Sequence, residues 1–137
     1  MAVTRNDRNV TWDTGSSSKT VSVNTRVDSD AMTFDATDIK GSIQIKADNQ
    51  GTPAAGDTAD FYIKWTTDGS TYDTDEFAEG PYRLDTVAAN TPGEDPAVMS
   101  IPVEPGRYKG YKLSVVCAQA ATRNVTVSAR EQTQRLA

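Results

Sequence analysis

Acidic side chains are the groups in this chain whose type and spacing could most readily do chemistry. One cluster is formed by Asp28, Asp30, Asp35 and Asp38, and a second is the run Asp73-Thr74-Asp75-Glu76. Clustered carboxylates of this kind can bind Ca²⁺. Neither cluster has the ligand spacing or the closing glutamate of a regular calcium loop. We therefore interpret both as solvated loop carboxylates, with a calcium site as the alternative, and we expect no cofactor.

Enzymatic chemistry finds little support in the residue types present. A pair of carboxylates could hydrolyse a glycosidic bond, but nothing in the sequence selects two of them. The chain has no histidine and a single cysteine, so a serine or cysteine nucleophile would lack its usual base. Cys117 lies on the apolar side of an alternating segment, which predicts a buried small side chain. We predict that the protein is not an enzyme.

Five residues are predicted to contact a partner. Tyr72 and Tyr82 lie in an irregular segment, residues 70–96, and could contact a protein or stack on a sugar ring. Trp12 is an isolated large apolar residue in a polar N-terminal stretch and is costly to leave in water. Arg5 and Arg8 are expected to pair with acidic groups on the partner.

The elements that must position these residues are β-strands. Apolar and polar residues alternate with a period of two, so that Phe61, Ile63 and Trp65 point one way while Tyr62 and Lys64 point the other. Expected strands cover residues 19–27, 37–47, 59–67, 82–87, 97–103, 108–118 and 122–130. We expect the last two to form a hairpin across residues 119–121, and Gly41 to mark a bulge or a close backbone approach.

The strand count predicts an all-β fold. About seven or eight short strands separated by turn residues are typical of a single antiparallel β-sandwich, jelly-roll or Ig-like in topology. The sandwich is expected to cover residues 19–130. A polar N-terminal arm, residues 1–18, precedes it, and a polar tail, residues 131–137, follows it.

Length and charge limit the classes of function. A chain of 137 residues fits one domain, and its net charge of −5 and pI of about 4.6 disfavour binding to nucleic acid. No apolar run approaches the length that spans a bilayer, so we expect no membrane partner. The N-terminus lacks the apolar core of a signal peptide, which predicts synthesis in a cytoplasm.

Four strand-like motifs resemble a family of small virion structural proteins of tailed bacteriophages. In that family a "Gly-Asp-x-x-Asp-Phe-Tyr" strand precedes a loop, a "Leu-Asp-Thr" step, a "Tyr-Lys-Leu" strand and a final "Val-Ser-Ala" strand. The matching stretches here are residues 56–63, 84–86, 111–113 and 123–129. The resemblance covers about residues 37 to 130.

The resemblance implies a structural role in the virion. It points to a capsid decoration (cement) protein that binds the major capsid protein, stabilises the head and forms a homo-oligomer. Alternatives are another virion component, such as a head–tail connector, tail or fibre protein, or a carbohydrate-binding module for host attachment. In every case the expected location is the virion, with other virion proteins as partners.

Overall fold

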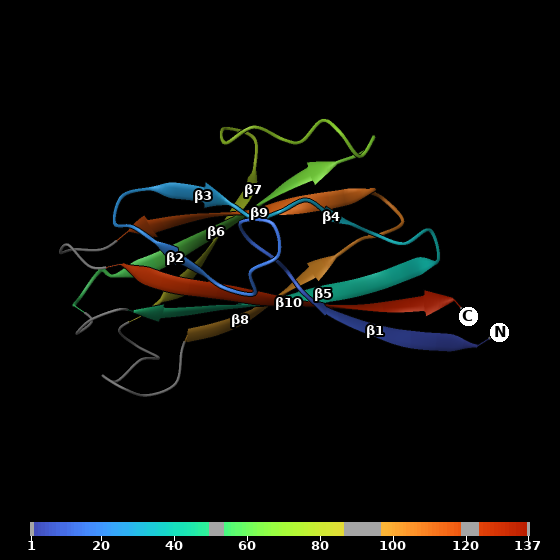
Figure 1. The fold of residues 1–137 in the computed structure, drawn as a ribbon, viewed down its shortest axis with the longest axis horizontal. Helices are drawn as coiled ribbons and strands as arrows, with labels where there is room; N and C mark the ends of the chain where they lie inside the picture. The colour runs from blue at the N-terminus through green and yellow to red at the C-terminus, as the bar shows by residue number, and fades with distance from the viewer. Residues whose placement is uncertain (1, 50–53, 87–96, 119–123, 137) are drawn as a thin grey trace.

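The protein is built entirely of β-strands in the part that the structure describes. The computed structural model describes residues 2–49, 54–86, 97–118 and 124–136, and these contain ten strands in two sheets (Figure 1). The strands are β1 (Val3–Asn9), β2 (Lys19–Val21), β3 (Arg26–Asp28), β4 (Met32–Thr33), β5 (Asp38–Asn49), β6 (Thr58–Thr66), β7 (Glu79–Asp85), β8 (Ala97–Val103), β9 (Gly110–Ala118) and β10 (Val125–Leu136). All pairings are antiparallel, which confirms the predicted antiparallel β-sandwich.

The strand order is that of a jelly roll rather than an Ig-like sandwich. One sheet has the order β1-β10-β5-β8, with β2 also paired to β10, and the other has the order β3-β9-β6-β7, with β4 also paired to β9. β1 and β2 pair with successive stretches of β10, and β3 and β4 pair with successive stretches of β9. β1 and β2 therefore together fill one strand position in their sheet, and β3 and β4 together fill one in theirs. Each sheet then has four strand positions, and their order is the double Greek key of a jelly roll.

The core lies between the two sheets and follows the predicted alternation. Phe61 and Ile63 of β6 are fully buried, and Trp65 is 7% exposed. From the other sheet, Ile43 and Ile45 of β5 face them and are also fully buried. The fully buried side chain of Cys117 confirms its prediction as a core residue, since the interior positions of a sandwich are filled from both sheets. Predicted strands 59–67 and 97–103 correspond closely to β6 and β8.

Gly41 marks a close backbone approach, as expected. It pairs with Thr133 of β10, and a Cβ atom at this position would lie 2.4 Å from the Gln132 carbonyl oxygen. The bulge lies next to it, where the register of β5 shifts between Gln134 and Arg135 of the partner strand. A side chain at position 41 would therefore force the two strands apart.

Two of the predicted strand arrangements are wrong because the chain changes sheet between them. The expected strand over residues 19–27 is broken into β2 and β3, which belong to opposite sheets, and Asn24 between them has a φ of 57°. The expected hairpin of residues 108–118 with 122–130 does not form, since β9 and β10 also lie in opposite sheets. The residues predicted for its turn, 119–121, lie outside the described residues.

The predicted arm and tail are both parts of one sheet. β1 pairs with β10 in register from Val3 opposite Leu136 to Asn9 opposite Arg130, and the two ends of the chain lie side by side (Figure 1). The expectation of an arm over 1–18 and a tail over 131–137 rested on their polar side chains. Backbone hydrogen bonds are indifferent to side-chain polarity, and an edge strand tolerates charge on its outer face.

Trp12 is a core residue and not a partner contact. It is fully buried in a short excursion between β1 and β2, and a two-way backbone hydrogen bond with Ser16 closes the turn. The Asp30 carboxylate fastens the excursion to the opposite sheet by accepting hydrogen bonds from the Thr14 and Gly15 amides and the Thr11 hydroxyl. The excursion thus inserts the indole between the sheets, where its burial stabilises the fold.

Substitution Trp12→Ala is expected to destabilise the isolated protein by about 3–5 kcal/mol, because it removes a fully buried aromatic side chain and leaves a cavity. The measurement is chemical denaturation followed by circular dichroism. Val3→Ala serves as the control, since Val3 is 53% exposed and should shift the unfolding free energy by less than about 0.5 kcal/mol. A loss below about 1 kcal/mol for Trp12→Ala would mean that the indole is not a core residue.

Candidate functional site

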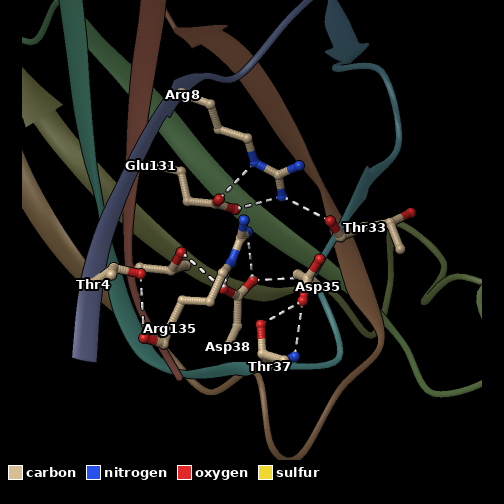
Figure 2. A network of polar contacts seen from close by, with 9 residues as sticks. Thr4, Arg8, Thr33, Asp35, Thr37, Asp38, Glu131 and Arg135 are labelled. Atoms are coloured by element: carbon tan, nitrogen blue, oxygen red, sulfur yellow. Dashed lines mark hydrogen bonds and ion pairs between the residues drawn. The ribbon is translucent and has the colours of Figure 1, made fainter. Parts of the chain in front are cut away.

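A buried carboxylate holds the N-terminal strand in place. Glu131 of β10 is fully buried and points between the sheets, where it accepts hydrogen bonds from Arg8 of β1, with Nε at 2.6 Å and Nη2 at 3.0 Å (Figure 2). The Arg8 Nη2 atom also donates to the carbonyl oxygen of Thr33 in β4, at 2.9 Å. Arg8 was predicted to meet an acidic group of a partner. Its acidic group lies instead in its own chain, so that prediction is wrong.

Tyr111 links the same carboxylate to the second sheet. Its hydroxyl donates to Glu131 Oε1 at 2.8 Å across the sandwich. Burial, followed by the nearby negative charge of Glu131, holds the pKa of Tyr111 well above its ordinary value, so the hydroxyl stays protonated and remains a donor. Burial alone would lower the pKa of Arg8, but its hydrogen bond to Glu131 and the charge of Glu131 raise it. Tyr111 therefore stays a neutral hydrogen-bond donor, and Arg8 stays positively charged, beside the buried carboxylate.

A second ion pair fixes the chain end next to it. Asp38 of β5 accepts from Arg135 Nε at 2.8 Å, from the Thr133 hydroxyl at 3.1 Å and from the Asp35 amide at 2.8 Å (Figure 2). Burial would raise the pKa of Asp38, but these hydrogen bonds outweigh burial and lower it. Together the Glu131 and Asp38 networks account for the polar residues on the inner side of β10. They are structural, because their donors and acceptors already satisfy one another.

The outer face of the β1-β10-β5-β8 sheet is the first surface open to a partner. A shallow hollow there is lined by polar side chains from four strands: Arg5, Asp7, Ser42, Gln44, Ser100, Arg130 and Gln132. Arg5 has a 68% exposed side chain and pairs with Asp7 at 3.1 Å. Of the two predicted arginines, Arg5 is therefore the more accessible, because the Arg8 side chain is 33% exposed and is paired with Glu131.

The second surface is a loop, residues 67–78, that is fastened over the outer face of the other sheet. The Asp73 carboxylate accepts from the Trp65 amide, and Asp75 pairs with Lys64 and Arg26. Tyr72 is half-buried, with the Lys112 ammonium 4.5 Å from the centre of its ring. Phe77 projects from this loop and is 75% exposed. Sequence reasoning singled out this irregular segment but missed Phe77, whose exposure depends on how the loop is held.

The third surface is an aromatic cleft that contains Tyr82. It opens where β7 meets the connection between β8 and β9, and its lining includes Trp65, Glu79, Tyr82, Glu104, Arg107 and Tyr108. Trp65 and Tyr108 stack with ring centres 4.3 Å apart. The Tyr82 hydroxyl donates to Glu79 Oε2 at 2.8 Å. Tyr82 and Tyr72 therefore lie on different surfaces, and the predicted residues do not form one site.

The acidic clusters are used for ion pairs and turns. Asp28 and Asp75 both pair with Lys64, and Asp35 accepts hydrogen bonds from the Thr37 hydroxyl and amide, which lower the pKa of Asp35. Within residues 2–49, 54–86, 97–118 and 124–136, no group of three or more histidine, cysteine or acidic residues is arranged to hold a metal ion. The same part of the chain contains no helix long and apolar enough to cross a membrane.

Comparison with solved structures identifies similar capsid proteins. The chain superposes on the VP2 subviral particle protein of infectious bursal disease virus with a TM-score of 0.58, at 11% identity, over 97% of this chain and 32% of that one. It matches a chain in the structure of the Gx strain of this virus with a TM-score of 0.52, at 8% identity, over 97% and 32% of the two chains. In the T13 viral particle the TM-score is 0.50, at 10% identity, over 97% and 35%.

These matches concern the fold. The chain spans about a third of the length of the capsid chains that it matches, and the identity is far below the level at which function transfers. No protein-family profile matches the sequence. No curated protein sequence matches it either. The chain therefore has the jelly-roll fold that occurs within a viral capsid protein.

Substitution Glu131→Gln is expected to destabilise the protein by about 3–5 kcal/mol, because it leaves Arg8 without its buried counter-charge. The double variant Arg8→Met/Glu131→Gln should recover part of this loss. Urea denaturation of the parent, the single variants Arg8→Met and Glu131→Gln, and the double variant measures the coupling. Arg130→Gln is the control, since Arg130 lies one residue earlier on the exposed side of β10. Equal stability of Glu131→Gln and Arg130→Gln would contradict a clamping role for the carboxylate.

Proposed function

We propose that this chain is a non-enzymatic structural protein of a virion, and specifically a capsid decoration protein that binds the major capsid protein of a tailed bacteriophage. The observation that supports the virion role best is the fold, because 97% of this chain superposes on part of a viral capsid protein with a TM-score of 0.58. The four sequence motifs support the narrower assignment to tailed bacteriophages. On this proposal the protein is made in the host cytoplasm and ends in the virion.

Other proteins with this fold bind sugars or metals, so the fold alone leaves several functions open. The chain has no histidine, which is the commonest metal ligand, and this disfavours the metal-dependent jelly-roll enzymes. Its acidity, with a net charge of −5, disfavours packaged DNA as a partner. A protein partner suits the accessible features best, since these are a polar sheet face, an exposed Phe77 and an aromatic cleft.

The proposed contacts with the capsid differ from the set inferred from the sequence. Arg5, Tyr72 and Tyr82 remain candidates, because each lies on one of the three surfaces described above. Arg8 and Trp12 are not among the proposed contacts, because Arg8 pairs with Glu131 of the same chain and Trp12 is fully buried. Phe77 is added, because the fastened loop presents it to solvent with little further loss of entropy on binding. Symmetric homo-oligomers over capsid axes would multiply modest contacts through avidity.

The number of copies in purified virions tests this function. We expect on the order of hundreds of copies, as measured by quantitative mass spectrometry against the major capsid protein, because a decoration protein follows the icosahedral lattice. About six or twelve copies would contradict decoration and favour a connector, tail or fibre component. Absence from the virion would overturn the structural role altogether.

Substitution Phe77→Ser is expected to reduce occupancy of undecorated capsids by about tenfold, since an exposed aromatic ring on a rigid loop is the kind of residue that dominates an interface. Co-sedimentation with capsids measures it. Ile39→Ser is the matched control, because Ile39 is also an exposed apolar residue, at 45%, but lines neither the sheet-face hollow nor the aromatic cleft. Unchanged occupancy for Phe77→Ser, or an equal loss for Ile39→Ser, would remove Phe77 from the interface.

A further inference from the structure

Tyr82 differs from the other four tyrosines of this protein in the surroundings of its ring. Of the five tyrosines, three have a cation over the ring. The pairs are Arg26 over Tyr62 at 4.6 Å, Arg107 over Tyr108 at 5.4 Å and Lys112 over Tyr72 at 4.5 Å. Tyr111 is fully buried against other aromatic rings. Tyr82 is left, and no cation of the described ranges lies over its ring.

Glu79 beside it is also without a counter-charge. Its carboxylate accepts the Tyr82 hydroxyl hydrogen bond at 2.8 Å, and it forms no ion pair with any residue that the structure describes. Burial, and then Glu79, raise the pKa of Tyr82 to about 12, so the phenol stays neutral and directs its proton at the carboxylate. Tyr82 and Glu79 together thus present an aromatic ring and a negative charge to the cleft.

The opposite wall of the cleft indicates which kind of group a tyrosine and a glutamate can bind together. There Arg107 lies over the Tyr108 ring and its Nη1 atom is 3.5 Å from Glu104 Oε2. On this wall an aromatic ring, a carboxylate and a guanidinium are all present, in Tyr108, Glu104 and Arg107. At Tyr82 the ring and the carboxylate of Glu79 are present, but the cation is missing. The two glutamates and one arginine leave the cleft with one negative charge in excess. A cation entering the cleft is therefore favoured both by the ring and by the local charge.

We propose that this cleft binds an arginine side chain of a protein partner, with the guanidinium over the Tyr82 ring and paired with Glu79. Arginine fits better than lysine, because its planar group stacks on a ring while its N–H groups donate to a carboxylate in the same plane. A sugar could also stack on Tyr82 but would leave Glu79 without a counter-charge. That the arginine belongs to a neighbouring virion protein rests on the proposed function, whereas its binding to the cleft does not.

Titration of the ¹⁵N-labelled protein with a short peptide, Ac-Gly-Arg-Gly-NH₂, tests the cleft directly. We expect saturable shifts of the amide signals around Glu79 and Tyr82, with a dissociation constant on the order of millimolar for so small a probe. The peptide with citrulline in place of arginine, which is nearly isosteric but neutral, should bind at least about tenfold more weakly. The spectra themselves show whether each protein is folded.

Two variants locate the binding. Glu79→Gln keeps an acceptor for the Tyr82 hydroxyl but removes the charge, so arginine should then bind no better than citrulline. Glu76→Gln removes the same charge from the exposed loop outside the cleft and should bind arginine as the parent protein does. An equal loss in both variants would show that only net charge matters and would overturn the proposal.

Other outcomes separate this inference from the proposed function. Equal shifts with both peptides, or saturable shifts with methyl glucoside and none with the arginine peptide, would overturn the arginine site. Neither result would alter the number of copies in virions. Conversely, arginine binding by a protein that is absent from virions would overturn the virion role and leave the cleft assignment intact.

Discussion

The pairing of one buried carboxylate governs how this chain closes. Glu131 is fully enclosed between the sheets, and an ionised group in that position must be matched by charge and hydrogen bonds. Arg8 supplies the charge from β1, and Tyr111 supplies a hydrogen bond from the opposite sheet. The contacts of this single side chain thereby connect β1 to β10 and one sheet to the other. The polar ends of the chain thus become two paired strands of one sheet, β1 at its edge and β10 beside it.

The same arrangement explains where the protein can meet other molecules. The inner polar groups are satisfied by one another, and the Trp12 excursion is fastened across the sheets by Asp30, which leaves a closed scaffold. The surfaces open to other molecules then lie on the outside: the polar sheet face, the fastened loop with Phe77, and the cleft between β7 and the β8–β9 connection. On the proposed function, these separate surfaces would contact neighbouring virion proteins.

Sequence reasoning succeeded where side-chain polarity follows the strand period. The alternation of Phe61, Ile63 and Trp65 predicted both the strand and its buried face. It failed at β10, where Glu131 and Thr133 point inward although they are polar, so the period continues without a hydrophobic signal. The partner of Glu131 lies 123 residues away, and no local pattern encodes such a pairing.

Among the candidate contact residues, those that local sequence patterns identify also differ from those that depend on long-range pairing. Tyr82 was identified from its residue type and its place in an irregular segment, and it does lie in a cleft. Arg8 and Trp12 were misassigned, because their roles depend on β1 joining the sheet and on Asp30 reaching across to the excursion. Phe77 and Glu79 went unnoticed, since exposure and missing counter-charges become visible only when the chain is folded.

The most direct test of the account is a cryo-electron microscopy reconstruction of the virion that contains this chain. The account predicts jelly-roll density at repeated positions on the outer surface of the icosahedral head, with the Phe77 loop or the Tyr82 cleft facing the major capsid protein. A head surface without such density, or the chain present solely in the tail, would contradict it.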